Sequence, residues 1–445
     1  MCDTERMKHG DEREFAAEIE HLEADNATMR LAALQTLYRA DAAGLRSGRF
    51  GADVNNHVHT RYSFSPYAPA HVAYQARRAG LRVVGSVDHD SIGAAAELRD
   101  AARALGMGAT VGAELRVSLA ETPFADRMIN NPDMRGNAYM VLHAVPAVSW
   151  DALGAWLSSR VAAREQRNRR QVALLNREVG ALFGELDYER DVRPISWVAR
   201  GGSVTERHIL YALAMRALQV EPDAAGLTRL IEQAVGQRLS PQIAARVADL
   251  ANPHRSYDIL GAFKSSLVPR IFIEPDRTEC APLAEAVDLA QRLGAIPAYA
   301  YLGDIETSAT GDKRAQRFED AYLDELVAYL ETTGVRAITY MPPRNSAAQL
   351  ERVQDLCRRH HLLEISGVDI NSSRQSFLCP EARAPQFRHL VESTWALVGH
   401  EIASDGDPAA GLFGSAAPVA EAPLAERVAH FAAIGRANCP AGIAP

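Results

Sequence analysis

From residue 53 onward, short strand-like runs alternate with amphipathic helical stretches, and this rhythm constrains the fold more than any other feature. Several of the amphipathic stretches end at a glycine, the residue that most easily closes a helix in a left-handed conformation. Alternating strands and helices are typical of parallel α/β folds. The sequence therefore predicts an α/β protein with a barrel-like parallel sheet, whose strand-like runs are 53–56, 82–87, 109–112, 139–142, 296–301, 337–341 and 363–367.

The same pattern predicts how the chain is organised. Residues 1–50 are expected to form a helical N-terminal arm that acts as a cap or as a dimer-forming segment. Residues 51–149 and 269–400 are expected to be the two halves of the barrel, and residues 150–268, which lack strand-like runs, a helical insertion between them. Residues 401–445 are rich in Ala, Pro and Gly, which predicts a linker or a tail that wraps the surface.

Composition narrows the classes of function. The net charge of −8 disfavours a general coat for nucleic acid or an anionic membrane surface, so no extended nucleic acid and no membrane is expected as a partner. The five cysteines include no CxxC pair, which argues against a disulfide framework or a cysteine zinc site. The charged N-terminal residues are unlike a signal peptide, so a cytoplasmic location is expected. A homo-oligomer is compatible with the sequence.

Polar residues that can bind metals follow successive strand-like runs. His57 and His59 are two residues apart, so on a strand both rings face the same side. Carboxyl ends of barrel strands meet at one mouth, where histidines and carboxylates can form a site for Zn²⁺, Mn²⁺ or Fe²⁺. The residues at these positions are His57, His59, Asp88, His89, Glu114, His143, Asp369 and Asn371.

Each of these motifs has an ordinary explanation when it is taken alone. An HxH pair is common by chance, the Asp88–Asp90 stretch could cap the following helix, and His143 could be a hydrogen-bonded core histidine. Their occurrence at consecutive strand ends favours a metal centre. A run of arginines at 160–170 on the inserted helix is expected to form a solvated face.

The motifs resemble those of the polymerase and histidinol phosphatase (PHP) superfamily of metal-dependent phosphoesterases. The match is nearest to the nucleoside-phosphate phosphatase and 5′–3′ exoribonuclease branch. The stretches that carry it are DVNNHVHTRYSFSPY, VGSVDHD, GAELRVSL, ERHILYALA, GAIPAYAYLGD and ISGVDIN, in family order, over about 53–380. The resemblance implies a distorted (β/α)7 TIM-like barrel.

The resemblance also implies metal ligands. His57, His59, Glu114 and Asp369 match the ligands of the family's first metal site. Glu114 would be shared with a second site that uses His143, but Tyr301 stands where the family has a further histidine. At the third site His89 is retained, whereas Asn371 replaces a histidine. One or two ions (Mn, Zn or Fe) are therefore expected in preference to three.

The implied activity is hydrolysis of a small organic phosphate, of nucleotide or sugar phosphate type, with water activated by metal. Substrate contacts are expected from Arg207, His208, Arg344, Tyr301 and Asn371, and proton transfer from His89, Asp88 or His208. Two alternatives stay open. One is a metal-binding or regulatory protein with a PHP-like barrel whose catalysis is reduced or lost. The other is a metal-dependent hydrolase of amidohydrolase type.

Overall fold

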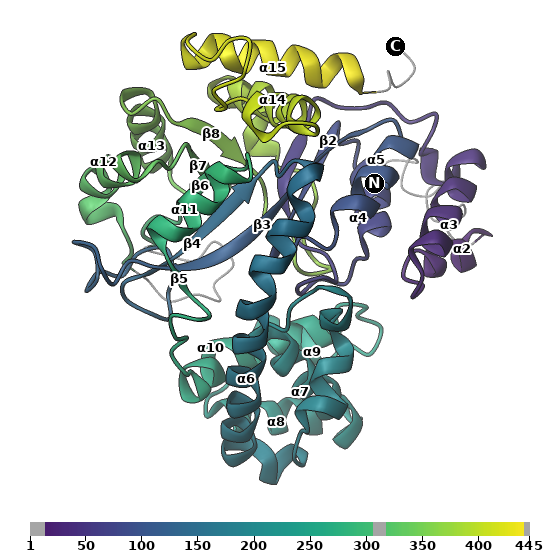
Figure 1. Ribbon diagram of the computed structural model, residues 1–445. Helices are drawn as coiled ribbons and strands as arrows, with labels where there is room; N and C mark the ends of the chain where they lie inside the picture. The colour runs from purple at the N-terminus through teal and green to yellow at the C-terminus, as the bar shows by residue number, and fades with distance from the viewer. Residues whose placement is uncertain (1–13, 306–316, 440–445) are drawn as a thin grey trace.

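The protein is a seven-stranded barrel with helices around it and a helical insertion at one end (Figure 1). The structure is a computed structural model that describes residues 14–305 and 317–439. The predicted α/β barrel is confirmed, and a strand lies in each predicted run. The strands, in barrel order, are β1 Val54–Val58, β2 Val83–His89, β3 Gly108–Ser118, β4 Asn137–His143, β6 Ile296–Ala300, β7 Ala337–Tyr340 and β8 Leu363–Ser366, and the short β5 Ala281–Pro282 pairs with β3.

One strand runs against the predicted direction. β4 is antiparallel to both of its neighbours, β3 and β6, whereas the other pairs along the barrel are parallel. The connection between β3 and β4, residues 119–136, is fully described and contains no helix, which is compatible with this reversal. A parallel strand needs a long crossover, but a reversed neighbour does not. His143, at the end of β4, follows Leu142, the register partner of Ala113, and therefore lies only slightly deeper in the barrel than Glu114.

The barrel closes between β1 and the segment that follows β8. Val58 bridges to Ile370 in parallel, and the Ile370 amide donates to the His57 carbonyl oxygen at 3.1 Å. The side chain of Asn55 reinforces this seam, because it accepts a hydrogen bond from the Val368 amide and donates one to the Val368 carbonyl. Asp369, which lies in this closing segment, is thereby held beside the end of β1.

Helices cover the outside and one end of the barrel. The arm packs on α4 and α5, and α14 and α15 close the barrel end opposite the insertion, with Phe431 and Leu412 fully buried (Figure 1). The described part of the predicted tail thus contributes to a core. These helices are α2 Ala16–His21, α3 Ala27–Arg39, α4 Pro69–Arg78, α5 Ala95–Ala104, α11 Leu283–Arg292, α12 Leu323–Thr333, α13 Ala347–Arg359, α14 Arg388–Ser404 and α15 Leu424–Asn438.

The insertion consists of five α-helices, with short helical turns between the first two, and has an apolar core of its own. They are α6 Trp150–Phe183, α7 Glu206–Val220, α8 Ala224–Val235, α9 Pro241–Ala248 and α10 Arg255–Ile271. The longest, α6, runs from the side of the barrel into the insertion (Figure 1). Within 14–305 and 317–439, the structure contains no helix with the length and apolar character needed to cross a membrane.

Candidate metal centre

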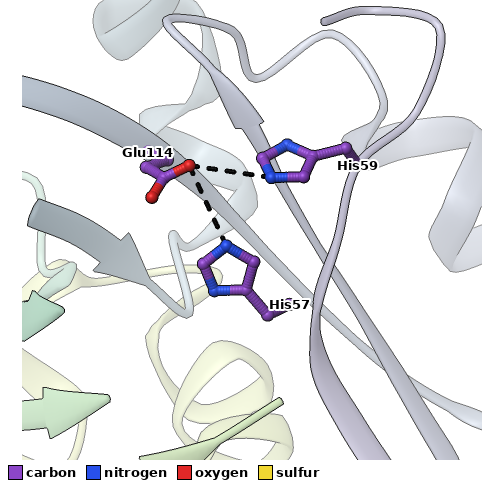
Figure 2. Close-up of side chains that lie close together, drawn as sticks. All are labelled: His57, His59 and Glu114. Carbon is purple, nitrogen blue, oxygen red and sulfur yellow. Dashed lines mark ion pairs between the residues drawn. The ribbon is translucent and has the colours of Figure 1, made fainter. Parts of the chain in front are cut away.

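Three side chains from two strands converge inside the barrel mouth. His57 and His59, at the end of β1, both point toward the Glu114 carboxylate on β3 (Figure 2). Glu114 Oε2 lies 3.9 Å from His57 Nε2 and 3.6 Å from His59 Nε2. One donor atom from each residue lies within 4.8 Å of the others, close enough to share one cation. The β1–β2 register shifts between Asn55 and Val58, next to the two histidines, and such local irregularities in a strand can re-aim side chains near active sites.

Asp369 and His89 border this cluster. Asp369 Oδ1 lies 3.3 Å from His59 Nε2, and Glu114 Oε2 lies 3.0 Å from His89 Nδ1. His89 pairs with Glu114 across the β2–β3 register, so the two side chains share a face of the sheet. The rings of His59 and His89 stack with centroids 4.6 Å apart. The structure therefore brings together all four residues predicted for the first metal site, with His89 beside them.

The electrostatics of the cluster follow from burial and charge pairing. Burial raises the pKa of Glu114 to about 8 and lowers the pKa of His57 to about 4. Burial also acts to lower the pKa of His59, but the hydrogen bond and charge of Asp369 outweigh it and raise that pKa. The same contact with His59 holds the pKa of Asp369 well below its usual range in spite of burial. A bound divalent cation would stabilise these buried side chains, because it favours neutral imidazoles and ionised carboxylates at the same time.

His143 lies deeper in the barrel. Its neighbour in the register is Ile296 of β6, and only 1% of its surface is exposed. Nε2 of His143 is buried without a hydrogen-bond partner among the described residues. Burial, with the nearby His57, lowers the pKa of His143 to about 3, so the ring is neutral. His143 is not one of the three close donors, but an unpartnered neutral imidazole is a competent metal ligand.

Two arginines predicted to contact substrate flank Asp369. Arg207 donates through Nη1 to Asn371 Oδ1 at 2.9 Å, and the Asn371 amide donates to Asp369 Oδ1 at 2.6 Å. Arg344 donates through Nε to the Leu302 carbonyl at 3.0 Å, and burial lowers its pKa against the opposing charges of Glu319 and Asp369. In the described part of the chain, these guanidiniums contact the Asn371 amide oxygen and the Leu302 carbonyl, and neither forms an ion pair with a carboxylate. Both are half-buried, which leaves positive charge at the mouth.

Three other predicted site residues lie away from the cluster. Asp88 pairs with Ala113, whose side chain belongs to the core outside the barrel, so Asp88 faces outward from β2. Tyr301 also belongs to that outer core and donates to Asp320 Oδ1 at 2.7 Å. His208 caps α7: its Nδ1 accepts from the Thr205 amide at 2.9 Å, and burial lowers its pKa to about 3. None of the three touches His57, His59 or Glu114 in the structure.

A buried charge network beside the cluster was not predicted. Three arginines, one from β3 and two from α6, meet three carboxylates, and the members are Arg116, Arg164, Arg167, Asp90, Glu206 and Glu279. Arg164 and Arg167 have only 4% of their side-chain surface exposed, so this part of the arginine run is not a solvated face. The signal was present in the spacing: Arg164, Arg167, Asn168 and Gln171 form one buried stripe on α6. Because the amide of Asp90 donates to the carbonyl of Glu114 at 2.9 Å, the network ties α6 to the cluster.

Comparison with known proteins gives distant structural neighbours. A protein from Bifidobacterium adolescentis, described as a candidate metal-dependent phosphoesterase, shares 18% identity at a TM-score of 0.49, over 74% of this chain and 91% of that one. An amidohydrolase from Chromobacterium violaceum shares 18% identity at a TM-score of 0.48, over 76% of this chain and 96% of that one. No protein-family model and no curated protein matches the chain. The residues of the site must therefore support any functional proposal.

Proposed function

We propose that the chain is a metal-dependent phosphoesterase that hydrolyses a small organic phosphate. The observation that supports this proposal is the pairing of two features at one barrel mouth. One is the buried cluster of His57, His59 and Glu114 with Asp369 beside it. The other is a pair of arginines that form no ion pair with a described carboxylate. Arg207 bonds to Asn371, which contacts Asp369, and Arg344 lies where the charges of Glu319 and Asp369 act on it. Cation-binding donors next to guanidinium groups suit an anionic ester.

The residues fit a divalent cation. Imidazole nitrogens together with carboxylate oxygens are the ligands that Zn²⁺, Mn²⁺ and Fe²⁺ accept. His57, His59, Glu114 and Asp369 would hold one ion, and Glu114 with His143 could contribute to a second. A bound divalent cation supplies polarisation of the ester and a lowered pKa for water.

The chain's own side chains have separate tasks. Arg207 and Arg344 bind and orient the phosphate, and the half-buried setting of both guanidiniums limits competition from water. Asn371 positions Arg207 and Asp369 relative to each other, because it hydrogen-bonds to both. Of the residues expected to transfer protons, His89 borders the cluster, whereas Asp88 faces the other side of the sheet.

The test is phosphatase activity on a broad panel of phosphomonoesters and phosphodiesters. The protein is stripped with chelator and reloaded separately with Mn²⁺, Zn²⁺ and Fe²⁺. We expect hydrolysis that chelation abolishes and that His57→Ala reduces by at least about 100-fold. The control is His430→Ala on α15, at the opposite barrel end, which should retain activity. Absence of hydrolysis with every metal would refute the proposal, and the metal content would then distinguish an inert barrel from a regulatory one that binds metal.

The amidohydrolase alternative has weaker support. That type of site commonly uses a carboxylated lysine, and this chain has three lysines in all, Lys8, Lys264 and Lys313. The one in the described part of the chain, Lys264, is an exposed residue of α10. Hydrolysis of amides or lactones in preference to phosphoesters would favour this alternative. The expectations of a small-molecule partner and of a possible homo-oligomer stand as predictions.

A further inference from the structure

Asp88 is a buried carboxylate that accepts three hydrogen bonds and has no role in the proposed chemistry. It is 1% exposed and lies at the end of β2, on the face opposite to Glu114. Its Oδ1 accepts from the Thr60 amide at 2.7 Å and from the Ser63 hydroxyl at 2.6 Å. Its Oδ2 accepts from the Thr60 hydroxyl at 2.6 Å. These three bonds fix the turn that follows β1, so the carboxylate acts on the turn and not on substrate.

Ser63 connects this carboxylate to a residue of the metal cluster. Its hydroxyl lies 3.3 Å from His59 Nδ1, and both side chains are almost fully buried. A serine hydroxyl has one hydrogen to donate, and here Asp88 Oδ1 receives it, because that oxygen lies 2.6 Å away whereas His59 Nδ1 lies 3.3 Å away. Toward His59 the Ser63 oxygen can therefore only accept. Nδ1 of His59 must carry the hydrogen of that contact.

We propose that Asp88 and Ser63 together are positioning residues for His59. They hold its ring by Nδ1 and present the lone pair of Nε2 to the space between Glu114 and Asp369. The inference rests on the metal centre of the proposed function, since it assigns the pair the task of orienting a ligand. Partners that fix the tautomer and orientation of a metal-binding histidine commonly contribute 10- to 100-fold in metal affinity.

The insertion supports the same turn from its other side. The ring of His208, from the first turn of α7, lies beside the backbone of Ser63, and Phe64 packs edge-on against that ring with centroids 5.0 Å apart. Within the turn the Ser63 amide donates to the Thr60 carbonyl at 3.0 Å. The Ser63 hydroxyl is thus held in place independently of His59, which is what a positioning group requires.

The experiment compares Ser63→Ala with Ser65→Ala in the full-length protein. Ser65 lies in the same loop, and its hydroxyl accepts only a 3.4 Å contact from the Tyr67 amide. Zn²⁺ affinity is measured on chelator-stripped protein by competition with a chromogenic chelator, and urea midpoints in excess chelator report stability. We expect Ser63→Ala to bind Zn²⁺ about 10- to 100-fold more weakly, Ser65→Ala within about 2-fold of wild type, and Ser63→Thr to recover most of the loss.

A second readout does not need a working enzyme. In Zn²⁺-loaded protein with ¹⁵N-labelled histidine rings, the His59 signals are assigned by their loss in His59→Gln, and the ring is expected to carry its hydrogen on Nδ1 in the wild type. Equal Zn²⁺ affinity in the two alanine variants, or a His59 ring with hydrogen on Nε2 only, overturns the proposal. A protein with the expected affinities and tautomer but no phosphatase activity would instead refute the proposed function. If the wild type binds no Zn²⁺, the positioning proposal fails together with the metal centre.

Discussion

Replacing Arg167 with methionine should destabilise the protein strongly. Arg167 donates to both oxygens of Glu279, at 2.7 and 2.8 Å, and to Glu206 at 2.7 Å. The side chains of Arg167 and Glu279 are 4% and 3% exposed. Methionine keeps the length of the side chain but leaves the buried carboxylates with one cation fewer. The six-member network, with three arginines and three carboxylates, changes from neutral to a net charge of −1.

The magnitude follows from burial. Removing one partner of a buried ion pair costs about 3–5 kcal/mol, because the remaining charge stays desolvated. Glu279 keeps its contact with Arg116, and Glu206 keeps Arg164 and is 21% exposed, which places the loss near the lower figure. With an m-value of about 3 kcal/mol/M, a loss of about 3 kcal/mol lowers the urea midpoint by about 1 M. Unfolding is followed by circular dichroism in excess chelator, so that metal binding does not contribute.

The matched control is Arg169→Met on the same helix. Arg169 pairs with Glu189 at 2.7 Å, but the two side chains are 44% and 57% exposed. Exposed pairs contribute about 0–1 kcal/mol, so the midpoint should shift by no more than about 0.3 M. In the double variant Arg167→Met with Glu279→Gln, the loss should be smaller than the sum of the single losses. An Arg167→Met midpoint within error of the Arg169→Met midpoint would refute the account of the network.

Three further predictions concern the cluster, the mouth and the arm. Burial raises the pKa of Glu114 from 4.5 to about 8, so between these values the native metal-free protein keeps a proton that the unfolded chain releases, and its stability should fall as the pH rises from about 5 to about 8. Urea midpoints measured against pH should show this slope in the wild type and lose most of it in Glu114→Gln. Equal slopes in the two proteins would contradict the pKa shift. Arg344→Met should raise KM for a phosphoester about 10-fold or more, whereas an unchanged KM in steady-state kinetics would remove Arg344 from the phosphate site. Arg30 of α3 forms a buried ion pair with Glu97 of α5, where the arm packs on the barrel. Arg30→Met should therefore speed proteolytic cleavage before residue 50, whereas cleavage at the wild-type rate would show that the pair does not hold the arm in place.

Local patterns predicted the strands and much of the cluster. A strand forms in each predicted run, and the HxH spacing places both rings on Glu114, because alternation along a strand is a local property. Strand direction is not local. The β4 strand carries the expected residues, but its reversal depends on the connection before it and on the partner it finds.

Other differences arise from which face a residue takes. Tyr301 and Asp88 were expected at the mouth because of their positions in the motifs. Each directly neighbours a residue whose side chain faces inward, Ala300 and His89, so their own side chains face outward. Arg164 and Arg167 were expected in solvent because charged residues on a helix usually are. Their carboxylate partners include Asp90 and Glu279, which lie far from them in the sequence, and no local pattern predicts such pairing.

The reversal of β4 has a topological consequence for the insertion. Since β4 ends where β6 begins, and His143 is the register partner of Ile296, everything between these two residues is in effect the oversized loop of one β-hairpin. In an all-parallel barrel the same segment would be an obligatory crossover that returns the chain to the other end of the sheet. Here a tight turn could join the two strands and leave the path of the barrel intact. The helices that carry Arg164 and Arg207 to the mouth are therefore an addition that the barrel's connectivity does not require. This segment can change its size and chemistry while the seven barrel strands keep their neighbours, and the pairing that depends on it is that of the short β5 with β3.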